Sequence, residues 1–268
     1  MQLLLPTIHA AKIQAAIRTL QYYQPTDQPY YGCFSGGKDS VAIKALAAIA
    51  GVNIDWHYHV TTIDPPEQVA FIKRYHPDVI RTKPRRTFID WILSKGLPTR
   101  KTRWCCEKLK EGVAPRPSRL VMGIRWAESH RRSRAWQTFT HLRPATRGTC
   151  VCPIAHWTHE DTWTFIEHQQ LPYCSLYDAN YRRTGCILCP MAGAKLKKLH
   201  LEKYPTICEQ IRKHAAAYWN RRKRQGATSK SYTRFQSADD YWRWWLSDEP
   251  TPGKPEPCQG QLEFWSKE

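Results

Sequence analysis

The spacing of hydrophobic residues predicts an alternation of helices and strands along the first half of the chain. Apolar residues recur at helical spacing over residues 7–23, which favours an amphipathic helix. Residues 30–34 are aromatic and β-prone, and they predict a buried strand that stops at two glycines. Further helices are expected at 41–50 and 67–75, and further strands at 54–62, 79–80 and 120–124. This order predicts an α/β fold with a doubly wound parallel sheet.

The pattern changes after about residue 150. Helical segments are expected at 160–168, at 199–224 (long and basic) and at 238–246 (aromatic). From residue 247 onward prolines are frequent, and this tail is expected to be loose. We therefore predict four segments: an N-terminal helix (1–28), a nucleotide-binding domain (29–150), a helical, cysteine-containing extension (151–246) and a flexible tail (247–268).

Charge changes this picture, because basic residues are in large excess and are concentrated. The chain has 41 Lys+Arg against 23 Asp+Glu, a formal net charge of +18. Residues 100–147 hold 13 basic and 3 acidic residues, and residues 195–234 hold 12 and 2, so each stretch carries +10. The excess predicts a polyanionic partner, for which DNA is the first candidate. The alternative is a solvated basic surface beside a phosphate-rich small substrate.

No apolar run reaches the roughly 18 residues that a membrane span needs. The first six residues lack a basic region ahead of a long apolar stretch, so they do not form a secretory signal. We therefore expect a cytoplasmic protein without a membrane partner. In that compartment thiols stay reduced, so the ten cysteines are not expected to form disulfides.

The glycine loop between the first predicted strand and its helix is the clearest chemical signal. Two glycines let the backbone approach an anion, and the helix that follows adds a partial positive charge at its first turn. A lysine and two serines supply further donors. The spacing nearly fits a Walker loop, but an aspartate stands where a Mg²⁺-binding Ser or Thr is required. The predicted phosphate-binding residues are Ser35, Gly36, Gly37, Lys38, Asp39 and Ser40.

These six residues, together with several later motifs, resemble a known family. Ser-Gly-Gly-Lys-Asp-Ser is the signature of the PP-loop ATP pyrophosphatases, whose fold is of the adenine nucleotide alpha hydrolase type. The similarity continues through residues 60–67, 75–79, 104–110, 123–129, 171–178 and 183–191. Together these segments resemble the phosphoadenosine-phosphosulfate (PAPS) reductase-like branch over roughly residues 30–195. That branch includes sulfonucleotide reductases and the ATP pyrophosphatases of DNA phosphorothioation systems. The resemblance implies ATP and Mg²⁺ as cofactors.

Two cysteine pairs stand out as metal-ligand candidates. A Cys-x₂-Cys pair at 186 and 189 supplies two thiolates, and the adjacent pair at 105 and 106 is the natural source of two more. A 4Fe–4S cluster, zinc and buried free thiols remain open on spacing alone. The family resemblance implies the cluster, held by Cys105, Cys106, Cys186 and Cys189. Cys33, inside the first strand, is expected to belong to the core.

Two further charged residues follow predicted strands, at the sheet edge where ligands bind. Asp64 can orient Mg²⁺ or a ribose, or it can cap the next helix. Arg125 can bind a phosphate through two of its nitrogens, with Glu128 pairing with either Arg125 or Arg132; the alternative is a surface salt bridge. We take Lys38, Asp39, Asp64 and Arg125 as the candidate catalytic residues. The tryptophans at 242, 244 and 245 are expected mostly in the core, with stacking on bases as the alternative.

The resemblance leaves three functions open. The first is an ATP pyrophosphatase that adenylates a phosphate oxygen of DNA for sulfur insertion. Its partner would be a cysteine desulfurase or another sulfur donor, and an oligomer is one assembly state. The second is a sulfonucleotide reductase, which in this family carries a late Glu-Cys-Gly-Leu-His motif. The only late cysteine here, Cys258, stands in a different context, Glu-Pro-Cys-Gln-Gly. The third is a DNA-binding iron–sulfur subunit that uses ATP as a switch.

Overall fold

The computed structural model describes residues 7–111, 114–115, 118–142, 148–227 and 234–247. The chain forms two compact units, neither of them continuous in sequence. The first contains Met1–Arg85 and Cys106–Cys186, and the second contains Arg86–Cys105 and Ile187–Glu268. Residues 151–186, which we assigned to the extension, therefore belong to the unit of the glycine loop. Nearly all of the expected loose tail, Cys258 included, lies outside the described residues.

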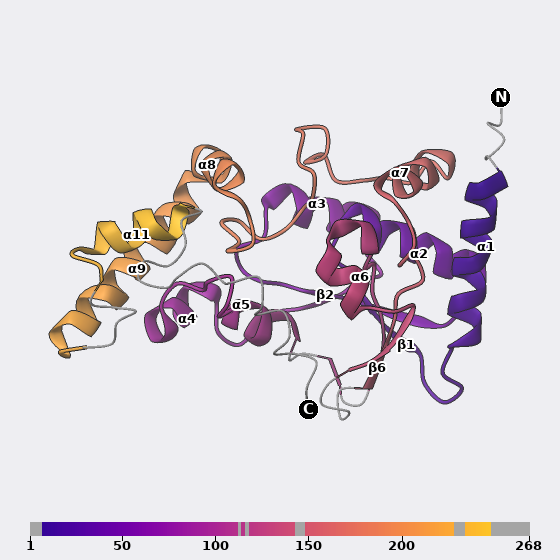
Figure 1. Ribbon diagram of the computed structural model, residues 1–268, viewed down its shortest axis with the longest axis horizontal. Helices are drawn as coiled ribbons and strands as arrows, with labels where there is room; N and C mark the ends of the chain where they lie inside the picture. The colour runs from indigo at the N-terminus through magenta and orange to yellow at the C-terminus, as the bar shows by residue number, and fades with distance from the viewer. Residues whose placement is uncertain (1–6, 112–113, 116–117, 143–147, 228–233, 248–268) are drawn as a thin grey trace. The chain divides into compact units, whose positions relative to one another are not determined.

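The first unit is built on a six-stranded sheet with the order β3-β2-β1-β4-β6-β5 (Figure 1). All neighbouring strands are parallel except β5, which runs antiparallel to β6 at the edge. The α/β prediction is thus confirmed, with one antiparallel edge strand added. The strands are β1 (Tyr30–Cys33), β2 (Ile54–His59), β3 (Ile80–Thr82), β4 (Ser118–Val121), β5 (Phe139–His141) and β6 (Gly148–Val151).

Helices flank this sheet as its connections. In Figure 1, α1 and α7 lie beside α2, and both helices are packed against it. The crossovers β1–α2–β2 and β2–α3–β3 run in the same direction across the sheet, so their right-handedness places α2 and α3 on one face. The helices are α1 (Thr7–Tyr22), α2 (Lys38–Ala50), α3 (Pro66–Tyr75), α6 (His130–Ala135) and α7 (His159–His168), with a π-helical turn η1 (Glu107–Glu111) and a 3₁₀ turn η2 (Trp126–Glu128).

The strands β5 and β6 were not predicted, because their sequences are short and mostly polar. Gly148 opens β6 with φ of +93°, a conformation that side-chain-bearing residues rarely adopt. A Cβ atom at this position would overlap the carbonyl oxygen of Ser118 on the neighbouring strand. The close approach of β4 and β6 at their first residue pair therefore depends on glycine.

The second unit is helical. Its helices are α4 (Phe88–Lys95), α8 (Ala194–Lys203), α9 (Pro205–Arg224) and α11 (Ala238–Leu246), and the short helix α5 (Trp104–Cys106) spans its boundary with the first unit. Helix α9 packs against α4 and α11. The single helix expected over 199–224 is wrong: it is interrupted at Tyr204, because Pro205 has no amide hydrogen to continue α8 and instead starts α9.

Aromatic side chains fix the core of the second unit. Trp242 and Trp245 are buried, and the Trp245 indole donates a hydrogen bond of 2.6 Å to the carbonyl oxygen of Pro98. The Tyr241 hydroxyl accepts a 2.7 Å hydrogen bond from the amide of Leu97. The core assignment of Trp242 and Trp245 is therefore confirmed. Trp244 is less buried and packs against the guanidinium of Arg234.

His76 in the first unit predicts a loss of stability in acid. The Nδ1 atom of His76 lies 3.3 Å from the Lys44 ammonium and accepts a hydrogen bond from it, so the ring is neutral. The Nε2 atom is buried and has no hydrogen-bond partner among the described residues. Burial, with the Lys44 charge, lowers the pKa of His76 to about 4. A folded-state pKa below the unfolded value of about 6.5 means that stability is complete above pH 6.5 and is lost as the pH falls towards 4.

We therefore expect the free energy of unfolding to drop between pH 7.5 and 4.5, with His76 contributing about 2–3 kcal/mol of the drop. Urea unfolding at the two pH values measures this effect. In His76→Gln the drop should be smaller by that amount, whereas His141→Gln, at an exposed position of β5, should behave like the wild type. Equal drops in wild type and His76→Gln would refute the assignment.

Within the part of the chain that the structure describes, no helix is both long and apolar enough to cross a membrane.

Candidate nucleotide-binding site

The site lies where the order of the sheet changes direction. From β1 the chain continues to β2 and β3 on one side, whereas β4 and β6 lie on the other side of β1. Two loops leave the carboxyl ends of the adjacent strands β1 and β4 at this point, the position where open α/β sheets bind ligands. The loops touch: a Cβ atom on Gly123, after β4, would stand 3.0 Å from the backbone carbonyl carbon of Asp39. Glycine at 123 therefore allows the two loops to meet.

The glycine loop has the geometry of an anion-binding turn. Gly36 has φ of +73° and packs against the Ile72 side chain, so a larger residue does not fit. Gly37 is the N-cap of α2, without a side-chain cap, and leaves the first amides of the helix to other acceptors. The Ser40 hydroxyl donates to the Gly37 carbonyl oxygen at 2.8 Å and closes the turn. The loop predicted from sequence is thus formed as expected.

A buried group of charges lies directly behind the loop. One Asp39 carboxylate oxygen is 2.6 Å from Arg125 Nε, and the other is 3.2 Å from Lys38 Nζ. The Lys38 and Arg125 side chains are almost fully buried. The Thr162 hydroxyl, from α7, donates a longer 3.4 Å bond to Asp39. Two cations around one carboxylate leave a net positive charge at the N-terminus of α2, which favours a bound anion.

A cavity of about 600 Å³ opens in front of the loop, entirely within the first unit. One part is lined by loop residues, among them Ser35, Gly37, Asp39 and Ser40. Another part of the lining is apolar and is formed by one hydrophobic cluster that includes Leu120, Met122, Ile124, Trp136 and Leu142. A polar, anion-binding part and an apolar part match the two chemical halves of a nucleotide, its phosphates and its base.

Asp64 and Arg125 do not take the positions that we expected for them. Both Asp64 carboxylate oxygens are held by Thr61, at 2.7 Å from its amide and 2.7 Å from its hydroxyl. The N-cap of α3 is Pro65, so Asp64 does not cap that helix. Of the four candidate catalytic residues only Asp39 lines the cavity; Lys38, Asp64 and Arg125 do not.

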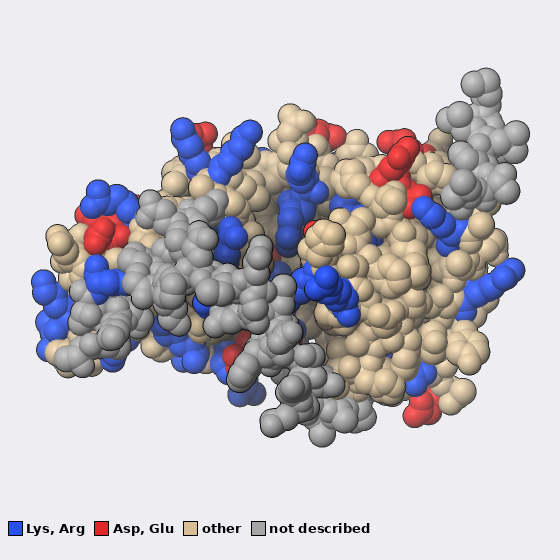
Figure 2. All heavy atoms as spheres, in the orientation of Figure 1, with Lys and Arg blue, Asp and Glu red and all other residues tan. Residues whose placement is uncertain are grey.

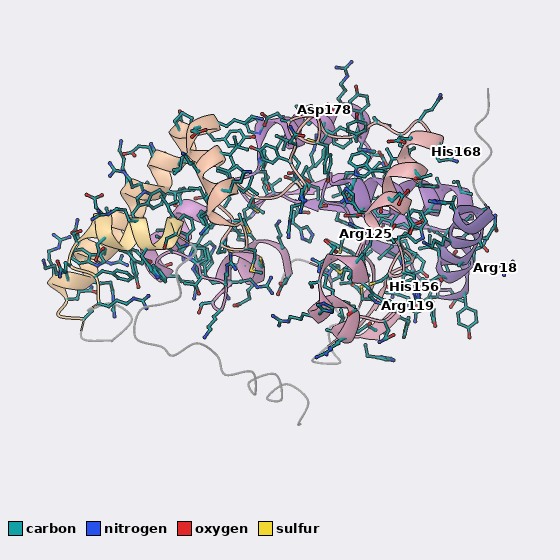
Figure 3. All side chains as sticks on the ribbon, turned by 45° about the horizontal axis from the view of Figure 1, so that its top comes forward. Arg18, Arg119, Arg125, His156, His168 and Asp178 are labelled. Carbon is teal, nitrogen blue, oxygen red and sulfur yellow. The ribbon has the colours of Figure 1, made fainter. Side chains whose placement is uncertain are left out.

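Arg125 lies in the interior of the first unit, as Figure 3 shows, and is not part of a surface salt bridge. Its backbone amide donates to Glu128, and Glu128 pairs with Arg132 through its carboxylate. Of the two pairings that we considered for Glu128, the ion pair is therefore the one with Arg132. We assign Arg125 to holding Asp39 in place.

Two histidines of β2 also line the cavity. His59 Nδ1 lies 2.9 Å from the Lys110 carbonyl oxygen and therefore donates; burial lowers the pKa of His59, so the ring is neutral. Its Nε2 then accepts from the Tyr31 hydroxyl at 2.6 Å. His57 stacks on the Tyr31 ring, with centroids 3.9 Å apart. Both histidines line the cavity and present neutral rings to it, because burial lowers the pKa of His57 as well.

Lys110 also lines the cavity, beside two of the predicted metal ligands. Its pKa is raised well above the ordinary value, chiefly by Cys186, with which it shares a hydrogen bond, and also by Asp64 and Cys106. Cys106 and Cys186 are thus close together in the first unit, whereas Cys105 and Cys189 belong to the second. Among the described residues, no group of three or more His, Cys, Asp or Glu side chains is arranged to hold a metal ion. The four-cysteine site stays a prediction.

Three other cysteines form a buried thiol group beside the cavity. Cys150 and Cys152 are fully buried, with their sulfurs 3.8 Å apart, and Cys33 lines the cavity next to them. Burial and the neighbouring thiol of Cys152 raise the pKa of Cys33 to about 12. A thiol with that pKa is a poor nucleophile near neutral pH, which agrees with a packing role for Cys33.

Sequence reasoning missed two residues at the mouth of the loop. Tyr177 and Thr184 come from the segment after α7 and line the cavity beside Gly37. Both lie within motifs that resemble the family, but an aromatic ring and a threonine in a loop carry no local signal for phosphate binding. Only the tertiary structure brings them to residues nearly 140 positions earlier.

Comparison with known proteins supports the family resemblance. The family model described as the phosphoadenosine phosphosulfate reductase domain matches residues 30–192. A curated, uncharacterized protein of Methanocaldococcus jannaschii is 26% identical over 238 residues, which cover 83% of this chain and 47% of that protein. An adenosine 5′-phosphosulfate reductase of Halalkalibacterium halodurans is 28% identical over 177 residues, covering 61% of this chain and 74% of the reductase. The chain spans about half the length of the M. jannaschii protein and of a second protein from that organism.

Two solved structures are also similar. A PAPS reductase from Candida auris, solved as a phosphate complex, has a TM-score of 0.49 at 14% identity and covers 69% of this chain and 98% of its own. The U34-tRNA thiolase NcsA from Methanococcus maripaludis, solved with its [4Fe-4S] cluster, has a TM-score of 0.40 at 11% identity and covers 82% of both chains.

Proposed function

Because the chain belongs to the phosphoadenosine phosphosulfate reductase family, we propose that its first unit is an adenylating enzyme that converts ATP into AMP and pyrophosphate. The observation that carries the proposal is the loop at the N-terminus of α2, which opens into a cavity with a polar and an apolar part. The phosphates of ATP would bind at the loop, and the adenine would bind against the apolar part.

In the proposed reaction an oxygen of the acceptor attacks the α-phosphorus of ATP. A new P–O bond forms, the bond to the β-phosphate oxygen breaks, and pyrophosphate leaves with its negative charge. Lys38 and the loop amides stabilise that charge, and Asp39 fixes the position of the Lys38 ammonium. Mg²⁺ would be held mainly by the phosphates, with Asp39 as the loop carboxylate that faces them.

We further propose that the acceptor oxygen belongs to a DNA phosphate and that the outer sulfur of a persulfide, such as that of a cysteine desulfurase, then attacks the adenylated phosphorus. A P–S bond forms and the P–O bond to AMP breaks, and an external thiol cleaves the S–S bond, is itself oxidised to a disulfide and leaves the phosphorothioate. The net charge of +18 supports a DNA partner. The four cysteines predicted as ligands would hold a 4Fe–4S cluster, and two of them, Cys106 and Cys186, lie near Lys110 in the first unit.

The alternative function is sulfonucleotide reduction, favoured by the reductase relatives that match about 60% of the chain. An assay that measures AMP and pyrophosphate released from ATP, with Mg²⁺ and duplex DNA, tests the main proposal. A parallel assay for sulfite, with adenosine 5′-phosphosulfate and thioredoxin, tests the alternative. Sulfite without pyrophosphate would replace our proposal by the reductase, whereas ATP binding with neither product would leave a DNA-binding subunit switched by ATP.

The exposed lysines and arginines of the second unit predict how DNA binds. Figure 2 shows Lys and Arg side chains over the visible surface of this unit. Not all of them are free for DNA: Arg221 donates to the Leu93 carbonyl oxygen, and Lys223 lies over the Trp219 ring. Four of the exposed basic residues on α8 and α9 are Lys195, Lys198, Lys213 and Arg224.

Changing these four residues to Gln should weaken binding to labelled duplex and flatten its salt dependence, because each lost phosphate contact removes about 0.9 from the slope. ATP binding should not change. The matched control removes four exposed basic residues of the first unit: Lys73, Arg74, Arg81 and Lys83. Equal losses in both variants would show that net charge, not the second unit, determines affinity.

A further inference from the structure

The hydroxyl of Tyr177 is bound to an amide that the loop would otherwise offer to a nucleotide. The Lys38 amide donates to the Tyr177 oxygen at 2.9 Å. Lys38 is the first residue of α2, so its amide is one of the donors that lack an acceptor within the helix. In an anion-binding loop this is a position for a phosphate oxygen.

Thr184 lies close to the same oxygen. Its backbone and its side chain both interact with the Tyr177 hydroxyl. A Cβ atom on Gly37 would stand 3.1 Å from the Thr184 hydroxyl and 3.4 Å from those of Tyr177 and Ser35, so these hydroxyls surround one point at the loop. The Lys38 ammonium lies over the Tyr177 ring, 5.8 Å from its centroid. A helix-N-terminal amide, neighbouring hydroxyls and an ammonium around one point suit an oxygen that carries negative charge.

We propose that the Tyr177 hydroxyl occupies the place of a phosphate oxygen and is displaced when pyrophosphate or the phosphates of ATP bind at the loop. Tyr177 is then a positioning residue: it satisfies the donors of the empty loop and competes with the anion. The inference rests on the proposed function, because it requires the loop to bind pyrophosphate. The segment that carries Tyr177 also carries Thr184, so displacement changes the hydrogen bonds of both residues.

A neighbouring tryptophan offers a direct signal for this movement. The Trp163 ring, on α7, packs edge-on against Tyr177 with centroids 5.1 Å apart. Figure 3 shows the adjacent residue, Asp178, at the outer edge of the first unit, so the segment has solvent on one side. Movement of the Tyr177 ring away from Trp163 should therefore change the emission of Trp163. The variant Trp163→Phe identifies that part of the total emission.

The test measures pyrophosphate binding by the full-length wild type and by Tyr177→Phe. Calorimetry gives the affinity, and Trp163 emission reports the movement of the Tyr177 ring. Without the hydroxyl, the Lys38 amide and Thr184 have no phenol oxygen to release, so Tyr177→Phe should bind pyrophosphate about fivefold more tightly. Its emission before titration should already approach that of the wild type saturated with pyrophosphate. A purely structural role would instead weaken binding or lower the unfolding temperature.

Tyr173→Phe is the matched control. Its ring also packs against Trp163, at 5.2 Å, but its hydroxyl bonds to Asp178 and not to the loop. The control should bind pyrophosphate as the wild type does. Weaker pyrophosphate binding by Tyr177→Phe, or unchanged affinity with no change in Trp163 emission, would overturn the inference. In that case pyrophosphate binding by the wild type would still support the proposed function. No binding of pyrophosphate or ATP by the wild type would overturn both.

Discussion

Replacing Lys38 by alanine is expected to lower the rate of pyrophosphate release by about 100- to 1,000-fold, because one charge that stabilises the leaving group is lost. The fold should persist. Lys38 is one of two cations on Asp39, and Arg125 still pairs with that carboxylate at 2.6 Å after the change. Lys44→Ala is the matched control, since this lysine of α2 pairs with Asp78 and should not affect turnover. Wild-type turnover by Lys38→Ala would show that the loop is not the reaction site.

Asp39→Ala should be inactive as well, but for an additional reason. It leaves the buried Arg125 guanidinium without its partner, which costs about 3 kcal/mol of folding stability. The double variant Asp39→Ala with Arg125→Met removes both charges and should recover most of that stability without recovering activity. Steady-state turnover and urea unfolding, measured on the wild type and on these two variants, separate the role of Asp39 in stability from its role in catalysis. Full stability in Asp39→Ala alone would contradict the buried ion pair.

The second large effect is expected from the predicted cluster ligands. Protein purified without oxygen should contain about four irons per chain, and Cys106→Ser or Cys186→Ser should remove nearly all of them together with the brown colour. The readout is iron content with the visible spectrum, which does not depend on turnover.

Cys174→Ser is the matched control, since Cys174 is fully buried but is not among the predicted ligands. It should keep its iron even if it is less stable. Stoichiometric zinc without iron in the wild type would exclude the cluster, and retention of iron by Cys186→Ser would exclude that residue as a ligand.

Local signals predicted the loop well, because its conformation depends on neighbours in sequence. Gly36 needs a positive φ, the strand before it is β-prone, and the helix after it starts at Lys38. The break between α8 and α9 also has a local signal, because Pro205 cannot continue the helix that precedes it. We nevertheless predicted one long helix, because the aromatic and basic pattern continues on both sides of the proline.

Contacts between side chains could not be predicted from the sequence. Arg125 follows a strand and was expected to face a phosphate, but its partner is Asp39, 86 residues earlier. Asp64 was expected at the ligand, yet Thr61 holds both of its oxygens. Both residues follow a strand as predicted, although β2 ends at His59 and β4 at Val121, earlier than expected. The partner of Arg125 depends on how the loops after β1 and β4 meet, whereas Asp64 is held within its own loop by Thr61.

The discontinuous units also affect how the chain folds as it is synthesised. Helix α4 packs on α9, but α9 leaves the ribosome only after the rest of the first unit has been made, a delay on the order of ten seconds. During that time the apolar side of α4, with Phe88 and Ile92, lacks the partner that covers it in the finished protein. The nascent second unit is therefore the part of this protein most exposed to aggregation and to chaperone binding.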